Sequence, residues 1–402
     1  MIRSLTSVSL LVLPLLAFAH GEEQHQHGEA SDNKITVGAA ASIGWNSTGA
    51  ADSNGLWRIP GALMGGHALP AQKGGRVDDA SLWGNYRLNE RTQFNAAVGV
   101  HNDGSAKLEL ENLSVDYQLP TRKPITLSAG MLEPEFSPSA HHHPSTDTFA
   151  NSTLMADAFW GRSIHDKGVR VAGKPTEHTE IGVEAWNGDF FPAKSADGAQ
   201  DVYAKFERTT PKGWAFNGGA WVMQAQASNR SDDRYFDGGH SHASATTTLP
   251  VDVKFSGDTT LAGSWLDVAA PTKHGIQTGL RYEAAQTQSS GKLFDATHQA
   301  NYDSDHLAYA VTPRVTYGKL QLSYRLEKLS LENKLTGNGA QILGEEANLI
   351  TDANPKRQTV QANWQINKNF AGRVAYTKDN TLAEADERIS VGLTWQDTLY
   401  KK

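Results

Sequence analysis

The chain has 402 residues, a formal net charge of -7 at pH 7 and no cysteine. Nucleic-acid-binding proteins are usually basic, so the charge argues against that class. The mean hydropathy is -0.48, and no apolar run approaches the ~18 residues that a membrane-spanning helix needs. Without cysteine no disulfide framework stabilises the protein, so the fold must do so alone.

The N-terminal residues have the pattern of a secretory signal peptide. Arg3 provides the positive charge, Leu10–Leu16 the apolar stretch, and Ala17–Ala19 the small residues of a cleavage site. We expect residues 1–19 to be removed and the protein to be exported. The mature chain then begins with a polar, His-rich segment, residues 20–33, which lacks periodicity and is expected to be disordered.

Residues 34–402 are predicted to form one β-barrel, because side chains alternate with a period of two along most of that length. In one hairpin the odd-numbered Val183 and Ala185 are expected to point to one face of the strand, and the even-numbered Glu180 and Glu184 to the other. Positions that share a face are said below to have the same parity. The same alternation predicts strands over residues 34–45, 81–88, 91–101, 107–119, 125–131, 167–173, 180–186, 201–208, 214–226, 259–269, 275–285, 307–317, 320–332, 358–366, 370–378 and 388–396.

The connections between these strands alternate between short turns and long polar loops. The long loops are expected at residues 46–79, 132–165, 227–242, 286–305 and 333–356. Short periplasmic turns, long external loops and strands of about ten residues are typical of outer-membrane barrels of Gram-negative bacteria. A secreted sandwich or propeller would have shorter strands and less bimodal connections. We therefore predict a transmembrane antiparallel barrel.

The number of strands depends on residues 243–256. If they belong to a loop or extend a strand, the count is sixteen; if they form a hairpin, it is eighteen. We predict sixteen.

A parity switch near Asn112 indicates a β-bulge. Aromatic residues near strand ends are expected to form interfacial girdles. These are Tyr117, Trp186, Trp214, Tyr317, Trp364 and Trp395.

A barrel of this size encloses an aqueous channel, and the polar parity of its strands should line it. The predicted pore-lining residues carry both signs of charge: Glu180, Glu184, Lys205, Glu207, Arg325 and Glu327. The function indicated is passive diffusion of small solutes or ions.

One part of the chain resembles a known family. The runs Phe149–Leu154, Phe159–Arg162, Asp166–Gly173 and Val183–Gly188, together with Ala129–Met131 and the nearby Glu133, Pro134, Phe136 and Ser137, are similar to the phosphate-selective porin O/P type. The resemblance covers about residues 125–190. It implies a sixteen-stranded, trimeric channel whose long loop, residues 132–165, folds inward and narrows the pore. In that family, rows of Arg and Lys in the lumen select phosphate.

Histidines cluster at three places: His20, His25 and His27; His141, His142 and His143; and His240 and His242. Neutral imidazole is a common ligand of zinc and copper, and positions i and i+2 of an extended chain share a face. These clusters are predicted to bind such ions transiently at a pore mouth. They could equally be solvent-exposed loop tips without a ligand.

No spacing of Ser, His and carboxylate residues marks a catalytic site, and we predict that the protein is not an enzyme and requires no cofactor. The expected partners are outer-membrane lipid, the transported solutes or ions and two further copies of the chain. Two alternatives stay open: an anion- or phosphate-selective channel, and a non-conducting binding or adhesion barrel.

Overall fold

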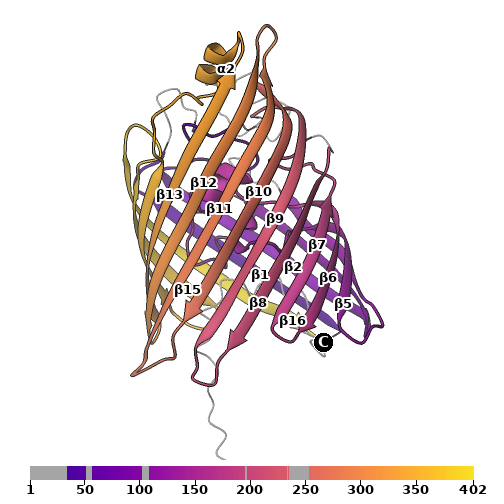
Figure 1. Ribbon diagram of the computed structural model, residues 1–402. Helices are drawn as coiled ribbons and strands as arrows, with labels where there is room; N and C mark the ends of the chain where they lie inside the picture. The colour runs from indigo at the N-terminus through magenta and orange to yellow at the C-terminus, as the bar shows by residue number, and fades with distance from the viewer. Residues whose placement is uncertain (1–33, 51–56, 102–107, 195–196, 233, 235–252) are drawn as a thin grey trace, which may run out of the picture.

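The structure, a computed structural model, describes residues 34–50, 57–101, 108–194, 197–232, 234 and 253–402. Sixteen antiparallel strands form a closed barrel in which each strand pairs with its chain neighbours and β16 pairs with β1 (Figure 1). The strands are β1 Ile35–Asn46, β2 Gly74–Asn89, β3 Thr92–His101, β4 Leu108–Gln118, β5 Ile125–Leu132, β6 Asp166–Thr176, β7 Thr179–Trp186, β8 Ala199–Thr209, β9 Ala215–Arg230, β10 Lys254–Ala269, β11 Ile276–Phe294, β12 Gln299–Tyr317, β13 Leu320–Thr336, β14 Lys356–Gln365, β15 Phe370–Asp379 and β16 Asp386–Lys401. The helices are the 3-10 turn η1 Pro138–Ala140, α1 Leu154–Phe159 and α2 Ala340–Glu346.

The predicted barrel of sixteen strands is confirmed. The stretch that left the strand number open is residues 243–256. Its last three residues, 254–256, belong to β10, which begins at Lys254, and residues 243–252 lie outside the described part. The bulge near Asn112 is also confirmed: Ala97 pairs with Asn112 but Val98 pairs with Leu110, which leaves Glu111 as the extra residue. Residues 1–33, with the expected signal peptide and His-rich segment, are likewise outside the described residues.

The outer surface of the barrel is apolar where the strands alternate. Val169, Ile181 and Val183 are 54%, 48% and 54% exposed, whereas Glu184, on the opposite parity, is fully buried. An apolar outer face on a closed barrel, with every strand paired, is the arrangement that can cross a bilayer. Among the described residues, no helix is long and apolar enough to span a membrane.

The wall of the barrel has unequal height. The strands β9 to β13 have 16 to 19 residues, whereas β5 and β7 have 8 (Figure 1). We call the end with the tight connections, such as Gly318–Lys319, the turn end, and the opposite end the loop end. Short turns of outer-membrane barrels are periplasmic, so the tall wall rises on the external side.

The prediction of a polar loop over residues 286–305 is wrong. There β11 and β12 continue and pair from Gln286 and Leu307 up to Phe294 and Gln299. In this upper part the outward positions, such as Gln288, Lys292 and Asp303, are polar, unlike those of the membrane-embedded part. Phe255, Leu293 and Tyr302 pack inward against Leu343 of α2. Where a strand projects beyond the bilayer, its outward side chains are polar. The sequence of such a strand therefore resembles that of a polar loop.

The girdle assignment of Trp186 is also wrong. Its side chain is 5% exposed and points into the barrel, where Nε1 donates a hydrogen bond to Oδ2 of Asp201 at 2.7 Å. The ring packs edge-on against Phe190. By contrast, Tyr317 and Trp364 are 64% and 62% exposed on the outer surface. Trp186 occupies the same parity as Glu184, and this parity faces inward.

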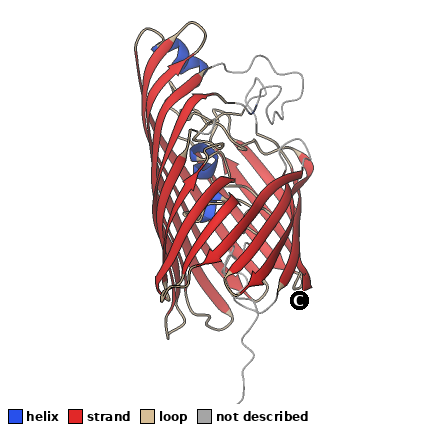
Figure 2. Ribbon diagram, turned by 90° about the vertical axis from the view of Figure 1, so that its right-hand side faces the viewer, coloured by secondary structure: helices blue, strands red, loops and turns tan. Residues whose placement is uncertain are grey.

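A hydrophobic core occupies part of the barrel interior. Its wall side comes from β8 to β13. Its inner side comes from the segment between β5 and β6, which carries α1 and lies inside the barrel (Figure 2), and from residues 57–68 of the connection between β1 and β2. The principal wall residues are Trp221, Met223, Leu261, Trp265, Ala285, Ala308 and Leu329. The barrel is therefore partly filled on one side, and any passage must lie towards the opposite wall.

Candidate functional site

The segment that fills the barrel, residues 133–165, is called the inner loop below. It leaves β5 after Leu132 and returns at Asp166. One face of this loop is fixed by aromatic packing. The ring of Phe136 lies 4.5 Å from that of Trp221, and Trp160 lies 6.0 Å from Trp221. Trp160 also donates its Nε1–H to the carbonyl of Ser139 at 2.9 Å, so its polar group is satisfied while its ring is buried.

The other face of the inner loop is held by arginines. We call Arg76 of β2, Arg325 of β13, Arg357 of β14, Arg373 of β15 and Arg388 of β16 the arginine wall. Within it, Arg325 donates to the carbonyl of Asn151 at 2.9 Å, Arg357 to that of Ser152 at 2.5 Å, and Arg373 to that of Pro144 at 2.7 Å. The loop thus spans the lumen, with a hydrophobic attachment on one side and charge-assisted hydrogen bonds on the other.

Glu327 connects the arginine wall to α1. Its Oε1 accepts the backbone N–H of Leu154, the first residue of that helix, at 2.7 Å. Its carboxylate also accepts from Arg357 at 2.9 Å and from Arg325 at 3.1 Å. The side chain of Glu327 is 1% exposed. A buried carboxylate shared by two guanidinium groups and a helix terminus is a strong tether, because each charge has a partner.

Asp78 organises the other end of the arginine wall. Its carboxylate lies 2.5 Å from Arg76 and 2.6 Å from Arg373, and it accepts the hydroxyl of Ser42 at 2.9 Å. The carboxylate lies against Gly44 on the neighbouring strand. A Cβ at Gly44 would lie 2.7 Å from Oδ2 of Asp78, so the glycine makes room for this ion pair.

A second charged cluster anchors the start of the inner loop on β6, β7 and β8. The buried Glu184 binds Arg170 and accepts the backbone N–H of Glu135 at 3.2 Å. Lys205 lies 2.5 Å from Glu135 and 3.2 Å from Glu180. The structure thus brings together Glu180, Glu184 and Lys205, and their charges are taken up by partners.

The remaining predicted pore-lining residues lie in different surroundings. Arg325 and Glu327 belong to the buried tether described above. Glu207 is exposed near the turn end of β8, at an inward parity position, away from the inner loop. Four arginines of this region were missed by the sequence analysis. The signal was present, since Arg357, Arg373 and Arg388 take the parity opposite to the outward Val360, Val374 and Ile389.

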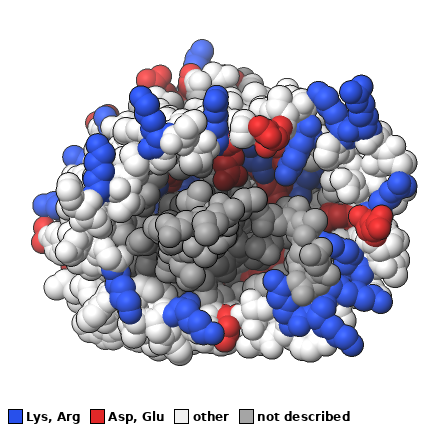
Figure 3. Space-filling view, turned by 90° about the horizontal axis from the view of Figure 1, so that it is seen from below, with Lys and Arg blue, Asp and Glu red and all other residues white. Residues whose placement is uncertain are grey.

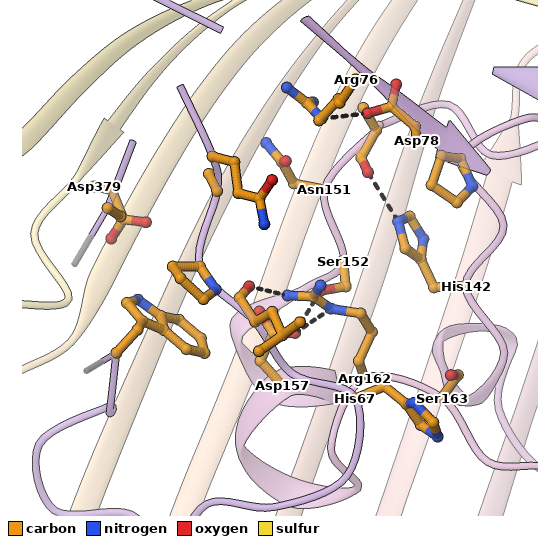
Figure 4. Close-up of a pocket in the computed structure, with 18 of the residues that line it drawn as sticks. His67, Arg76, Asp78, His142, Asn151, Ser152, Asp157, Arg162, Ser163 and Asp379 are labelled. Carbon is orange, nitrogen blue, oxygen red and sulfur yellow. Dashed lines mark hydrogen bonds and ion pairs between the residues drawn. The ribbon is translucent and has the colours of Figure 1, made fainter. Parts of the chain in front are cut away.

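Three hollows surround the part of the inner loop between His142 and Ser152. The first, of about 100 Å³, lies towards the loop end and is shown in Figure 4, where Arg76 lies beside Asp78 and Arg162 reaches Asp157. The second and third, of about 90 and about 100 Å³, lie towards the turn end. His142 and Ser152 line both the first and the second hollow, and Asp147 and Thr148 line both the second and the third.

The charges in these hollows balance. The first is lined by Arg76, Arg162, Arg357 and Arg388 and by Asp78, Glu109, Asp157 and Asp379. The second is lined by Arg281, Arg314 and Arg325 and by Asp147, Asp267 and Glu283. The third is lined by Arg373 and Asp147. Such surfaces hydrate and bind polar solutes without an excess of either sign of charge.

Two of the predicted metal ligands, His142 and His143, lie beside carboxylates. His142 Nδ1 lies 2.5 Å from Asp147 Oδ2, and His143 Nε2 lies 3.1 Å from Glu133 Oε1. Within the described part of the chain, no group of three or more His, Asp or Glu residues is placed to hold a metal ion. His20, His25, His27, His240 and His242 lie outside the described residues. His141 is half-buried after η1.

His143 makes the inner loop sensitive to pH. Burial alone would lower the pKa of its imidazole, but the carboxylates of Asp79 and Glu133 outweigh this and raise the pKa well above the ordinary 6.5. The protonated form therefore stabilises the folded loop. This stabilisation is fully present below pH 6.5 and is lost as the pH rises through the pKa of the folded state.

We expect a His143→Gln variant to separate this contribution from other titrations. Glutamine keeps a hydrogen-bond donor near Glu133 but cannot carry the charge. The Tm of wild type in detergent should exceed that of the variant by a constant amount below pH 6.5, and the difference should shrink as the pH rises above it. Thermal unfolding followed by circular dichroism measures this, and a difference independent of pH would contradict the assignment.

Comparison with solved structures agrees with this architecture. Salmonella typhi OmpF, solved in complex with daunomycin, has a TM-score of 0.53 and 11% identity, covering 91% of this chain and 98% of that one. The anion-selective porin from Comamonas acidovorans has a TM-score of 0.52 and 10% identity, covering 90% and 99%. Pseudomonas putida OprB has a TM-score of 0.50 and 11% identity, covering 91% and 94%. No protein-family model and no curated protein matches the chain.

The chain therefore has the fold of the outer-membrane porins, a closed antiparallel barrel with an inward-folded loop. Barrels of this kind reside in the outer membrane of Gram-negative bacteria.

Proposed function

We propose that the protein is an outer-membrane channel for the passive diffusion of small hydrophilic solutes. The observation that carries this proposal is the set of three polar hollows around residues 142–152, on both the loop-end and the turn-end side of the inner loop. The hydrophobic core restricts the passage to the side of the arginine wall. Solutes would pass through these hollows, beside the points where Arg325, Arg357 and Arg373 hold the inner loop.

The balance of guanidinium and carboxylate groups supports weak selectivity between anions and cations. Paired guanidinium and carboxylate groups along a narrow passage can bind polar and zwitterionic solutes without excluding one sign of ion. The alternative, an anion- or phosphate-selective channel of the O/P type, has support from the arginine wall itself. Nη1 of Arg76 and Nε of Arg388 are buried without a hydrogen-bond partner among the described residues, and these atoms could take an anion.

Reconstitution in a planar bilayer tests both alternatives. We expect discrete conductance steps and, under a salt gradient, a reversal potential close to zero for wild type. A double Arg76→Gln, Arg388→Gln variant removes two positive charges from the first hollow and should shift the reversal potential towards cation preference. A wild-type reversal potential strongly on the anion side would favour the phosphate alternative.

The control is Lys378→Gln, which removes an exposed positive charge paired with Glu387 on the outer face of β15. It should leave the reversal potential unchanged. A complete absence of conductance steps would overturn the channel and favour a binding or adhesion barrel. An unchanged reversal potential in the double variant would mean that the residues that select between anions and cations lie outside the first hollow.

Two further points belong to the proposal. A homotrimer is supported by the resemblance over residues 125–190 and by the low wall at β5 and β7, which leaves an apolar outer surface for a neighbouring subunit. Passage of zinc or copper through the His clusters stays a prediction from the sequence.

A further inference from the structure

The turn end of the barrel carries an excess of exposed basic side chains. Figure 3, a view onto this end, shows Lys and Arg distributed around the rim of the barrel. The exposed basic residues are Lys34, Arg91, Arg122, Lys123, Lys174, Arg208, Lys212, Lys273, Lys319, Lys368, Lys401 and Lys402, and we call this set the basic collar. The exposed acidic residues of the same end are Glu90, Glu177, Glu207 and Asp397.

This excess is local, because the whole chain has a net charge of -7. Exposed acidic residues concentrate on the upper part of the tall wall instead, for example Asp258, Asp303, Asp305 and Glu332. No residue of the basic collar forms an ion pair with a described carboxylate. Lys123 and Lys319 donate to the backbone carbonyls of Pro175 and Ile366, at 2.7 and 3.0 Å.

The basic collar lies directly at the edge of the apolar outer surface. Lys319 stands between Tyr317 and Leu320, which are 64% and 40% exposed, and Lys368 stands between the exposed Ile366 and Phe370. The same relation holds for Lys212 with Trp214, Lys273 with Ile276, Arg208 with Phe206 and Lys401 with Tyr400.

A basic group one to three residues beyond a lipid-facing side chain reaches the level of the lipid headgroups. Lys and Arg place their aliphatic stems along apolar surface and extend the charge to the polar layer. The basic collar is thus a ring of cations at headgroup depth around the barrel. A macromolecular partner would need a patch on one side, whereas headgroup phosphates surround the barrel on all sides.

We propose that the basic collar binds anionic phospholipids of the inner, periplasmic leaflet and enriches them around the barrel. The chemistry recognised is a headgroup with a net negative charge, as in phosphatidylglycerol, over a zwitterionic one. The attraction is electrostatic and close to the membrane surface, so it should weaken as salt is added.

Quenching of tryptophan fluorescence by brominated lipids tests the proposal. The protein is reconstituted in phosphatidylethanolamine vesicles with increasing brominated phosphatidylglycerol, and separately with brominated phosphatidylethanolamine. The exposed Trp214 and Trp364 lie next to the basic collar and report the lipids beside it. We expect a relative binding constant of roughly two to five in favour of the anionic lipid, falling towards unity at high salt.

A matched pair of variants separates the basic collar from net charge. Replacing Lys212, Lys273, Lys319 and Lys368 with Gln removes four charges at the turn end and should bring the constant close to unity. Replacing Lys292, Lys328, Lys334 and Lys378 with Gln removes the same charge from the outer face towards the loop end and should leave it unchanged. All eight side chains are exposed, so folding should persist, and the heat-dependent gel mobility typical of barrels checks this.

Equal quenching by the two lipids in wild type overturns the proposal. An equal loss in both variants also overturns it, since net charge would then be the cause. Binding of a soluble acidic polymer that depends on the basic collar, without lipid preference, would assign the surface to a different partner and equally reject it. Conductance is not part of this readout, so the result is independent of channel function.

Discussion

Replacing Glu327 with alanine is expected to lower the free energy of unfolding by about 3–5 kcal/mol, because two buried arginines lose the carboxylate that lies closest to them. Arg325 and Arg357 are 5% and 4% exposed, and both lose the carboxylate that they share. The N–H of Leu154 at the start of α1 also loses its acceptor. Equilibrium unfolding in urea, with the protein in lipid vesicles, measures the change.

The conservative control is Glu327→Gln, which keeps an oxygen near Leu154 but removes the charge. The free energy of unfolding of this variant should lie between those of wild type and Glu327→Ala. Amide hydrogen exchange over α1 should increase in the alanine variant, since the N–H of Leu154 has lost its hydrogen bond to Glu327 of β13. A change of under about 1 kcal/mol, the value of an exposed ion pair, would show that water replaces the carboxylate without difficulty.

Excision of residues 139–163 with a short Gly-Ser linker is expected to raise the single-channel conductance roughly two-fold or more, because a sixteen-stranded barrel encloses a wide aqueous channel once nothing fills it. The inner loop is held to the wall by the aromatic packing of Phe136 and Trp160 and by the arginine wall. The barrel itself should persist, since its strands pair with one another and not with the loop.

Shortening the connection that carries α2, residues 339–349, is the matched control. It also removes packed residues, at the top of the tall wall (Figure 1), but none of them lines the hollows around residues 142–152. Its conductance should stay close to that of wild type. Equal conductance in wild type and in the inner-loop excision would mean that solutes do not pass between the inner loop and the arginine wall.

The architecture of the barrel could be predicted from local pattern. The alternation of Val183 and Ala185 with Glu180 and Glu184 depends only on the geometry of a strand. A closed sheet with one face in lipid repeats that pattern in every strand, so the barrel and its short turns follow from counting, with sixteen or eighteen strands depending on residues 243–256. The bulge at Glu111 was detectable for the same reason, since it shifts the parity of the residues that follow it.

The prediction was wrong where the position of a residue relative to the membrane, and not strand geometry, determines whether its side chain is polar or apolar. Residues 286–305 alternate like any strand, but above the bilayer their outward side chains are polar, so the apolar repeat is lost. Trp186 was expected at the membrane surface because it ends a strand. Parity places it beside Asp201 inside the barrel, and parity was the stronger signal.

The sequence by itself determined the class of fold, an outer-membrane barrel with a polar inner face, because each strand carries this information locally. Only the tertiary structure decided how the lumen is filled. Arg325, Arg357 and Arg373 lie on three strands and meet the carbonyls of Asn151, Ser152 and Pro144 far away in the chain. Hydrogen bonds to backbone carbonyls leave no residue pattern, and closure of the barrel alone brings these groups into contact.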